Sequence, residues 1–206
     1  SMHSYYTRRT QPFTYGDHSI FTAEVASTVN ESLLMHHLLD KETNETMRRY
    51  LINYYIEEFR TTLFRQTMFA EFEMLTHKEV ENGGVLTAEW MCKLYNDLNH
   101  QYFGPALAPD EYIQYEWARI PHFYRAFYVY QYATGYSAAT AISAKILAEG
   151  EAARKNYIEF LKSGSSNDPV ELLKIAGVDM SSPEPIRMAM ETFKGLVEEL
   201  EQLMQA

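Results

Sequence analysis

The strongest structural signal in this chain of 206 residues comes from residues 45–80, which read ETMRRYLINYYIEEFRTTLFRQTMFAEFEMLTHKEV. Apolar side chains recur in this segment at intervals of three and four residues, so they form one stripe along a helix. The stripe consists of Leu51, Tyr55, Ile56, Phe59, Leu63, Phe64, Met68, Phe72 and Leu75. Thr43 is the expected cap at its start, and Asn82-Gly83-Gly84 is the expected stop. The segment therefore predicts one long amphipathic helix.

Helical periodicity also dominates the rest of the chain, and no segment alternates convincingly in the way of a β-strand. Asp17 is the expected cap of a helix that reaches Lys41, and Pro121 is the expected start of an aromatic helix that reaches Gly150. Further helices are expected over residues 87–103, 151–161 and 168–177 and from 182 onward, with a short turn at 109–115. The predicted fold is all-α with many helices, and residues 1–206 are expected to form a single domain without an internal boundary.

Composition narrows the classes of function. Eighteen basic residues against 28 acidic ones leave a formal net charge of −10, which argues against a nucleic-acid binder that relies on neutralising phosphates. Cys92 is the only cysteine, so a disulfide scaffold and a cysteine-based zinc ribbon are both excluded. The first ten residues lack the apolar core of a targeting segment, and the uncharged residues 126–144 contain too many polar groups for a membrane span. We therefore expect a cytoplasmic protein that does not bind membranes.

Familiar catalytic and metal-binding motifs are absent from the sequence. None of the seven histidines forms an H-E-x-x-H pair, and none has a glutamate three residues before it, as a di-iron helix bundle needs. His36 and His37 are adjacent, so on a helix they point about 100° apart and do not chelate together. The serine-nucleophile motif G-x-S-x-G and the phosphate-binding motif G-x-x-x-x-G-K-[ST] do not occur either. Taken alone, the chain contains no complete metal site or nucleophile triad.

A polar stripe on the helix after Asp17 has two interpretations. Glu24, Ser27, Thr28 and Glu31 fall on one helical face, and apolar residues flank that face on both sides. Because a buried carboxylate is costly unless it is paired, protonated or bound to a metal, Glu24 is a candidate metal ligand, with Glu31 supporting it from outside the coordination sphere. The alternative is a stripe that simply faces water.

The segment RIPHFYRAFYVYQY, residues 119–132, gathers one histidine and several tyrosines within about three helical turns. The candidates for chemistry in this segment are His122, Tyr124, Tyr128, Tyr130 and Tyr132. Tyrosine hydroxyls and an imidazole N–H that project into a dry cleft are good donors to a developing oxyanion. The alternative is aromatic core packing in which each hydroxyl has one partner.

Three stretches of the sequence resemble one family of enzymes. They are SMHSYYTRRTQPFTYGDHSIFTAEVASTVNESLL at residues 1–34, ARIPHFYRAFYVYQYATGYSAA at 118–139 and LLKIAGVDMSSPEP at 172–185. Over essentially its whole length the chain resembles the oligoendopeptidase F branch of the thimet oligopeptidase-like family of zinc metallopeptidases. In that family the motif H-E-L-G-H runs directly into S-M-H-S-Y-Y, and a glutamate further along supplies the third zinc ligand. The resemblance implies the C-terminal part of a catalytic domain, beginning just after H-E-x-x-H.

The resemblance also implies roles for the residues already singled out. Glu24, in F-T-A-E-V-A-S, falls at the position of the third zinc ligand, with Glu31 as its neighbour on the same helical face. The aromatic segment would supply donors to the tetrahedral intermediate and to the substrate backbone. His122 is the first of these donors, Tyr130 is preferred over Tyr128, and Tyr124 is a further candidate.

The sequence departs from the family pattern because both histidine ligands and the general-base glutamate are missing. The resemblance therefore implies zinc and oligopeptide substrates for the intact metalloendopeptidase, and neither tight zinc binding nor peptide hydrolysis for this chain alone. One alternative is a truncated, non-catalytic all-α domain that binds peptides or associates with itself. Another is a split enzyme whose N-terminal part arrives as a separate chain. A homo-oligomer formed through an exposed groove is also expected.

Overall fold

The computed structural model describes residues 1–108 and 110–205, and every regular element in those residues is a helix. The prediction of an all-α fold is therefore confirmed. No helix in the described part of the chain is both long and apolar enough to cross a membrane. The chain divides into two compact units, one comprising Ser1–Phe59 with Thr134–Ala206 and the other Arg60–Ala133. The expectation of a single domain stays a prediction, since such units occur within domains as well as between them.

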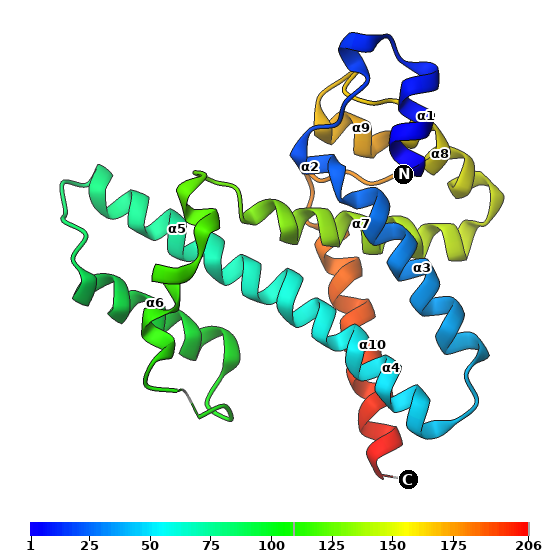
Figure 1. Cartoon of the computed structure of the whole chain (residues 1–206). Coiled ribbons are helices and arrows are strands. Elements are labelled where there is room, and N and C mark those ends of the chain that lie inside the picture. The colour runs from blue at the N-terminus through cyan, green and yellow to red at the C-terminus, as the bar shows by residue number, and fades with distance from the viewer. Residues whose placement is uncertain (109, 206) are drawn as a thin grey trace. The chain divides into compact units, whose positions relative to one another are not determined.

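The first unit combines the first 59 residues of the chain with its C-terminal third. It contains α1 (Met2–Thr10), α2 (Ile20–Ala23), α3 (Val25–Lys41), α4 (Glu45–Glu58), most of α7 (Tyr130–Glu149), α8 (Glu151–Lys162), α9 (Pro169–Ile175) and α10 (Glu184–Gln205). Helix α1 lies against α8, where the Thr7 hydroxyl donates a 2.9 Å hydrogen bond to the Leu161 carbonyl (Figure 1). The sequence 1–34 is thereby anchored to a segment about 150 positions later, well beyond the reach of local helix signals.

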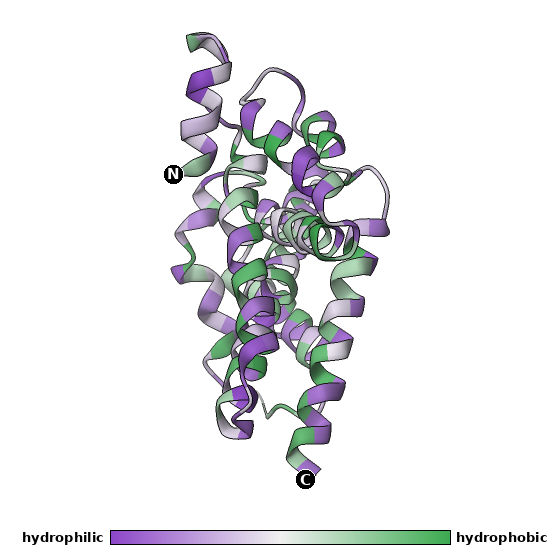
Figure 2. Cartoon of the chain, turned by 90° about the vertical axis from the view of Figure 1, so that its right-hand side faces the viewer, coloured by the Kyte–Doolittle hydropathy of each residue, from purple (hydrophilic) through white to green (hydrophobic). Residues whose placement is uncertain are grey.

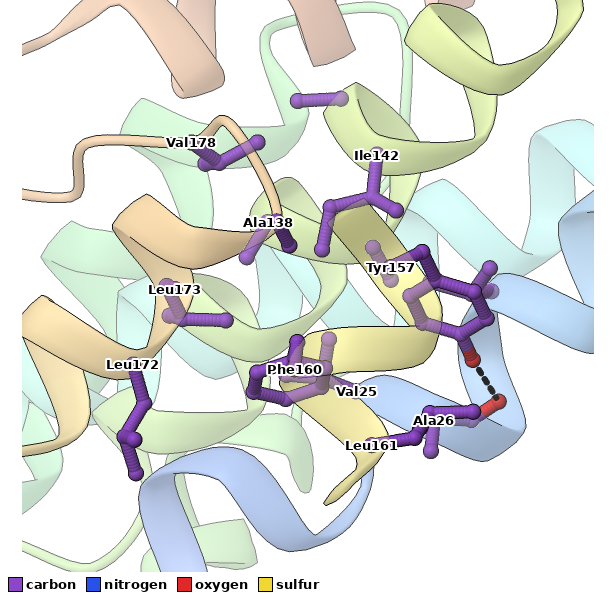
Figure 3. Close-up of a cluster of buried hydrophobic side chains, with 14 residues drawn as sticks. Val25, Ala26, Ala138, Ile142, Tyr157, Phe160, Leu161, Leu172, Leu173 and Val178 are labelled. Carbon is purple, nitrogen blue, oxygen red and sulfur yellow. Dashed lines mark hydrogen bonds between the residues drawn. The ribbon is translucent and has the colours of Figure 1, made fainter. Parts of the chain in front are cut away.

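The core of this unit forms where α3, α7, α8 and α9 meet (Figure 3). Helix α7 brings small side chains to the contact, and Ala138, Ala139 and Ala141 are fully buried. Larger side chains such as Phe160 and Leu173 fill the space that the alanines leave. This close approach of helices depends on the absence of bulk along α7, because protein interiors pack without sizeable voids.

The C-terminal helix α10 runs beside α4 (Figure 1). Green and purple alternate along it in Figure 2, as expected for a helix with one apolar face. Its apolar face buries Ala189 and Leu196, and Arg48 of α4 donates from Nε to Glu199 Oε1 at 2.6 Å. The pairing of α4 with α10 therefore combines apolar packing with an ion pair.

The second unit is built on a cluster of aromatic side chains. Helices α5 (Arg65–Glu81) and α6 (Ala88–Phe103) pack together, and the 3₁₀ helices η3 (Ile113–Arg119) and η4 (Pro121–Tyr124) follow them in the chain. The buried cluster consists of Met68, Phe69, Phe72, Tyr95, Leu98, Ile120 and Val129. The Tyr95 hydroxyl donates a 2.6 Å hydrogen bond to Glu116, so the aromatic core is tied to η3 by a polar contact.

Several predicted elements are confirmed by the structure. The long helix over residues 45–80 forms as α4 and α5, joined through a π-helical segment, η2 (Phe59–Phe64). Thr87 caps α6 by accepting a hydrogen bond from the Trp90 N–H, and Gly104 ends that helix with a φ of 70°. The helices after Gly150, Asp168 and Ser182 form as α8, α9 and α10.

Other details of the helix prediction were wrong. The helix expected from Asp17 begins only at Ile20 and breaks at Glu24, and the cap of α4 is Asn44, not Thr43. Helix α1 was not predicted, because its first turn carries little apolar periodicity. Pro109 of the expected turn at 109–115 lies outside the described residues.

The largest error concerns the aromatic helix expected from Pro121 to Gly150. The structure has a 3₁₀ turn at Pro121–Tyr124, an extended residue at Arg125, a positive φ of 56° at Phe127 and a helix only from Tyr130. The Phe127 N–H donates a 2.7 Å hydrogen bond to Glu73 Oε1. Because that N–H is held by a side chain of α5, it does not take part in an i→i−4 helical bond, and the chain turns before α7.

Candidate functional site

Glu24 lies at the junction of α2 and α3, where it is the C-cap of one helix and the N-cap of the next. Its backbone is in the right-handed helical region, with φ −89° and ψ −13°. Val25 and Ala26 beside it are buried in the core, so the Glu24 side chain is directed outward and is exposed. The Glu24 carbonyl accepts hydrogen bonds from the Ser27 hydroxyl at 2.9 Å and from the Thr28 N–H at 3.0 Å. The junction presents its carboxylate at the surface on a firmly held backbone.

The polar stripe of α3 faces outward in this structure. Glu24, Ser27 and Glu31 are exposed and Thr28 is half-buried, which agrees with the alternative of a stripe that faces water. The physical reason is that Val25, Val29 and the other core residues of α3 occupy one side only. The role of Glu24 as a metal ligand, with Glu31 beside it, stays a prediction.

The aromatic segment forms a compact group of three rings. The His122 ring stacks on Tyr128 with ring centroids 5.6 Å apart, and it meets Tyr132 edge-on at 5.9 Å. The Tyr132 hydroxyl donates a 3.2 Å hydrogen bond to the Tyr128 hydroxyl. The Arg125 guanidinium lies 5.9 Å from the Tyr128 ring centroid. We call His122, Tyr128 and Tyr132 the His122 cluster; it gathers two hydroxyls and one imidazole into one group of packed rings.

The other two predicted tyrosines lie differently. Tyr124 is 91% exposed at the end of η4, and Tyr130 is 41% exposed at the first position of α7. The structure thus brings Tyr128 to His122, although the sequence favoured Tyr130. Which hydroxyl assists a reaction stays a prediction.

The sequence reasoning missed one residue of this site, Glu73, and did not single out another, Tyr132. Tyr132 was noted only as one of several tyrosines, and its place in the His122 cluster depends on the turn before α7. Glu73 is 5% exposed and holds the Phe127 N–H, which sets the course of the loop that carries the cluster. The signal for Glu73 is faint: it is one acidic residue directly after Phe72 on the apolar stripe of α5.

The described residues do not make a metal site by themselves. No group of three or more histidine, cysteine, aspartate or glutamate side chains in residues 1–108 and 110–205 is arranged to hold a metal ion. A catalytic zinc ion needs three protein ligands and an open position for water. Glu24 alone falls short of that number, so the remaining ligands would have to come from outside these residues.

Comparison with known proteins assigns the chain to a family. Residues 1–192 match the model of Peptidase family M3, and the chain belongs to that family. It is 55% identical over 204 residues to the oligopeptidase PepF of Bacillus subtilis, covering 99% of this chain and 30% of that protein. It is 46% identical over 205 residues to an oligoendopeptidase F homolog of Lactococcus lactis, covering 100% of this chain and 34% of that protein.

Solved structures agree with this assignment. The crystal structure of oligoendopeptidase-F from Enterococcus faecium matches with a TM-score of 0.90 and 46% identity, over 99% of this chain and 37% of that one. A putative peptidase from Chlamydophila abortus matches with a TM-score of 0.92 and 42% identity, over 98% of this chain and 34% of that one. The resemblance to the oligoendopeptidase F branch is confirmed. The chain spans about a third of the length of the relatives it matches.

Proposed function

We propose that this chain is the C-terminal part of a zinc-dependent metalloendopeptidase that hydrolyses peptide bonds in short oligopeptides. The observation that carries the proposal is the match of residues 1–192 to Peptidase family M3, supported by relatives that are named oligopeptidases. The chain covers about a third of those relatives, so we assign the complete activity to the whole protein and not to this part of it alone. We place the intact enzyme in the cytoplasm, in keeping with the single cysteine.

Glu24 is the residue we assign to the metal in this proposal. Its carboxylate is exposed at a helix junction and is therefore open to a ligand set from another part of the protein. Glu31 lies two turns further along the same face and would hydrogen-bond to the coordinating groups without touching the metal. A zinc ion bound there would polarise the scissile carbonyl and activate a water molecule.

The His122 cluster is the group we assign to the substrate. The imidazole of His122 and the hydroxyl of Tyr128 are the donors, and the Tyr132 hydroxyl orients Tyr128 by donating a hydrogen bond to it. Donors of this kind stabilise a developing oxyanion when they are held in place before the reaction. Tyr130 and Tyr124 remain in the proposal as side chains that reach the substrate from the exposed side of the same segment.

A chimera tests the proposal. The corresponding third of the Bacillus subtilis oligopeptidase is replaced by this chain, and zinc content and cleavage of a quenched fluorescent oligopeptide are measured. We expect an active chimera, with Glu24→Gln lowering bound zinc and cleavage together by about a hundredfold or more. Glu42→Gln, an equal change of charge just after α3, is the matched control.

The outcomes of this experiment are distinct. A folded chimera whose zinc content and cleavage survive Glu24→Gln would contradict the assignment of Glu24. A folded chimera without cleavage would favour the non-catalytic alternative, in which the chain binds peptides or itself. The 206-residue chain alone, measured alongside, is expected to show neither tight zinc binding nor cleavage.

A further inference from the structure

A second site lies in the first unit, between α3 and α4 and away from the His122 cluster in sequence. It is a pocket of about 150 Å³ whose walls come from α3 and α4, with Tyr136 of α7 at its base. Leu34 and Leu38 form an apolar rim and are partly exposed, at 57% and 39%, so the pocket opens to solvent. All of its lining residues belong to one compact unit, which makes the pocket a feature of that unit alone.

The polar end of the pocket carries two carboxylates. Glu31 of α3 and Glu58 of α4 both line it, and the Tyr54 hydroxyl hydrogen-bonds to Glu58. The pKa of Glu58 is raised first by its burial and then by the negative charge of Glu31. No lysine, arginine or histidine occurs among the described residues that line the pocket. The pocket therefore has an excess of negative charge beside an apolar wall.

The hydroxyl of Tyr136 is an independent sign that a ligand is missing. The side chain is only 6% exposed, its ring packs edge-on against Phe59 at 4.9 Å, and its hydroxyl has no hydrogen-bond partner. Nearby hydroxyls are satisfied: Ser32 Oγ lies 2.8 Å from Tyr55 Oη and 2.7 Å from Ser143 Oγ. A buried hydroxyl without a partner is unfavourable, because it has given up water without replacement. Tyr136 lines the pocket, and its pKa is raised first by burial and further by the nearby Tyr55, Glu58 and Glu31.

The residues that line the pocket indicate which chemical group it would bind. Two carboxylates and a free hydroxyl match a group that carries a positive charge and several N–H donors. A metal ion fits poorly, since the described residues offer no group of three candidate ligands and the rest of the wall is apolar. A volume of about 150 Å³ accommodates a molecule the size of benzene. The pocket thus suits a small organic cation and not a hydrated ion.

We propose that this pocket binds a primary ammonium group that carries a short apolar substituent. The ammonium donates to Glu31, Glu58 and the Tyr136 hydroxyl, and the substituent rests against Leu34 and Leu38. The amino end of a peptide and a free amine share this chemistry. Glu31 also belongs to the metal site proposed above, but amine binding itself requires neither zinc nor peptidase activity, so it is tested on the chain as it stands.

The test uses benzylammonium as the probe and benzyl alcohol as its neutral counterpart, with binding followed by NMR shifts and calorimetry. We expect benzylammonium to bind about tenfold or more tightly than the alcohol, with shifts centred on residues 28–38 and 54–58. Glu58→Gln and Glu31→Gln each weaken binding by about tenfold, and Tyr136→Phe weakens it by several-fold while preserving the ring. Asp40→Asn on α3 and Tyr50→Phe on α4, which lie outside the pocket lining, are the matched controls.

Several results would overturn the proposal. They are equal affinities for benzylammonium and benzyl alcohol, shifts elsewhere on the protein, or losses that Asp40→Asn reproduces as fully as Glu58→Gln. Circular dichroism of each variant separates a lost site from a lost fold, and Glu31→Gln, at an exposed position, keeps the test open if Glu58→Gln does not fold. Leucinamide tests whether the ligand is the amino end of a peptide, and N-acetyl-leucinamide, which lacks the ammonium group, is its neutral control. Tighter binding of leucinamide than of benzylammonium supports a peptide amino end, and equal binding supports a free amine.

Discussion

At the scale of single residues, His3 and His18 form an unusual pair. Their rings stack with centroids 3.6 Å apart, His3 is 6% exposed, and the Nδ1 atom of each is buried without a partner. Burial, the nearby His18 and the amino terminus together lower the pKa of His3 to about 4. His3 is therefore neutral in the folded chain over a range of pH in which an unfolded histidine is protonated.

This pair predicts a loss of stability in weak acid. Because the folded pKa of His3 lies below its unfolded value, the unfolded chain binds more protons, and stability falls as pH drops from about 6.5 toward 4. Between pH 7 and pH 5, the free energy of unfolding is expected to fall by about 1–2 kcal/mol less in His3→Phe than in the unchanged chain. Urea unfolding at each pH measures this difference. His37→Phe, at an exposed position, is the control. An unchanged pH slope in His3→Phe would show that His3 is protonated in the folded chain.

Glu73 is the residue that sets the loop before α7. Its carboxylate accepts from the Phe127 N–H at 2.7 Å, at the one described non-glycine residue with positive φ. Glu73→Ala is expected to lower the free energy of unfolding by about 1–3 kcal/mol, since it leaves that N–H unpaired. It should also weaken the NMR contacts between the His122 and Tyr128 rings. Glu81→Ala on the same helix should do neither, and retention of the ring contacts in Glu73→Ala would refute the positioning role.

At the scale of elements, the middle of α7 carries small side chains and is buried among other helices. Ala138, Ala139 and Ala141 are fully buried between α3, α8 and α9, whereas the last turn of the helix is exposed. Ser143 adds a polar link, since its hydroxyl meets Ser32 of α3, which in turn meets Tyr55 of α4. The helix thus joins three others at short distance.

Overpacking α7 tests this description. Ala139→Leu inserts bulk into a filled core and is expected to destabilise the chain by about 1–3 kcal/mol. Ala148→Leu makes the same change on the exposed last turn and should change stability by less than about 0.5 kcal/mol. Thermal unfolding followed by circular dichroism compares the two. Equal effects would mean that the site near residue 139 has room for a larger side chain.

At the scale of the whole molecule, several large apolar side chains are exposed among the described residues. Ile20 at the start of α2 is 47% exposed and Phe127 is 50% exposed. Exposed apolar surface of this kind is commonly covered by association. The isolated chain is therefore predicted to form homo-oligomers.

Light scattering over a range of concentrations measures this association. We expect the isolated chain to shift from monomer toward dimer as its concentration rises, and Ile20→Glu to weaken the shift. Addition of the remaining part of the Bacillus subtilis relative should convert the dimer into a one-to-one complex. If that complex also regains zinc-dependent cleavage, the split-enzyme arrangement holds. A clean monomer at high concentration would contradict the prediction of an exposed, associating groove.

The helices that depend on local sequence patterns were predicted correctly. The apolar stripe of residues 45–80 and the helix over residues 87–103 are both set by neighbours within a few positions, and each is present in the structure. The aromatic segment was recognised as a site, but its helix was placed too early. The error arose because Glu73, which holds Phe127, is 54 positions away.

The sequence by itself determined the all-α class and the family, since helix periodicity and family motifs are both carried by short runs of residues. Tertiary structure alone decided that Glu24 is exposed at a helix junction and that Tyr128 and Tyr132 join His122. It also decided that the Tyr136 hydroxyl lies buried and unpaired beside Glu31 and Glu58. The physical reason is that burial and hydrogen-bond partners depend on which distant segments pack together, and no pattern within one helix specifies its partner.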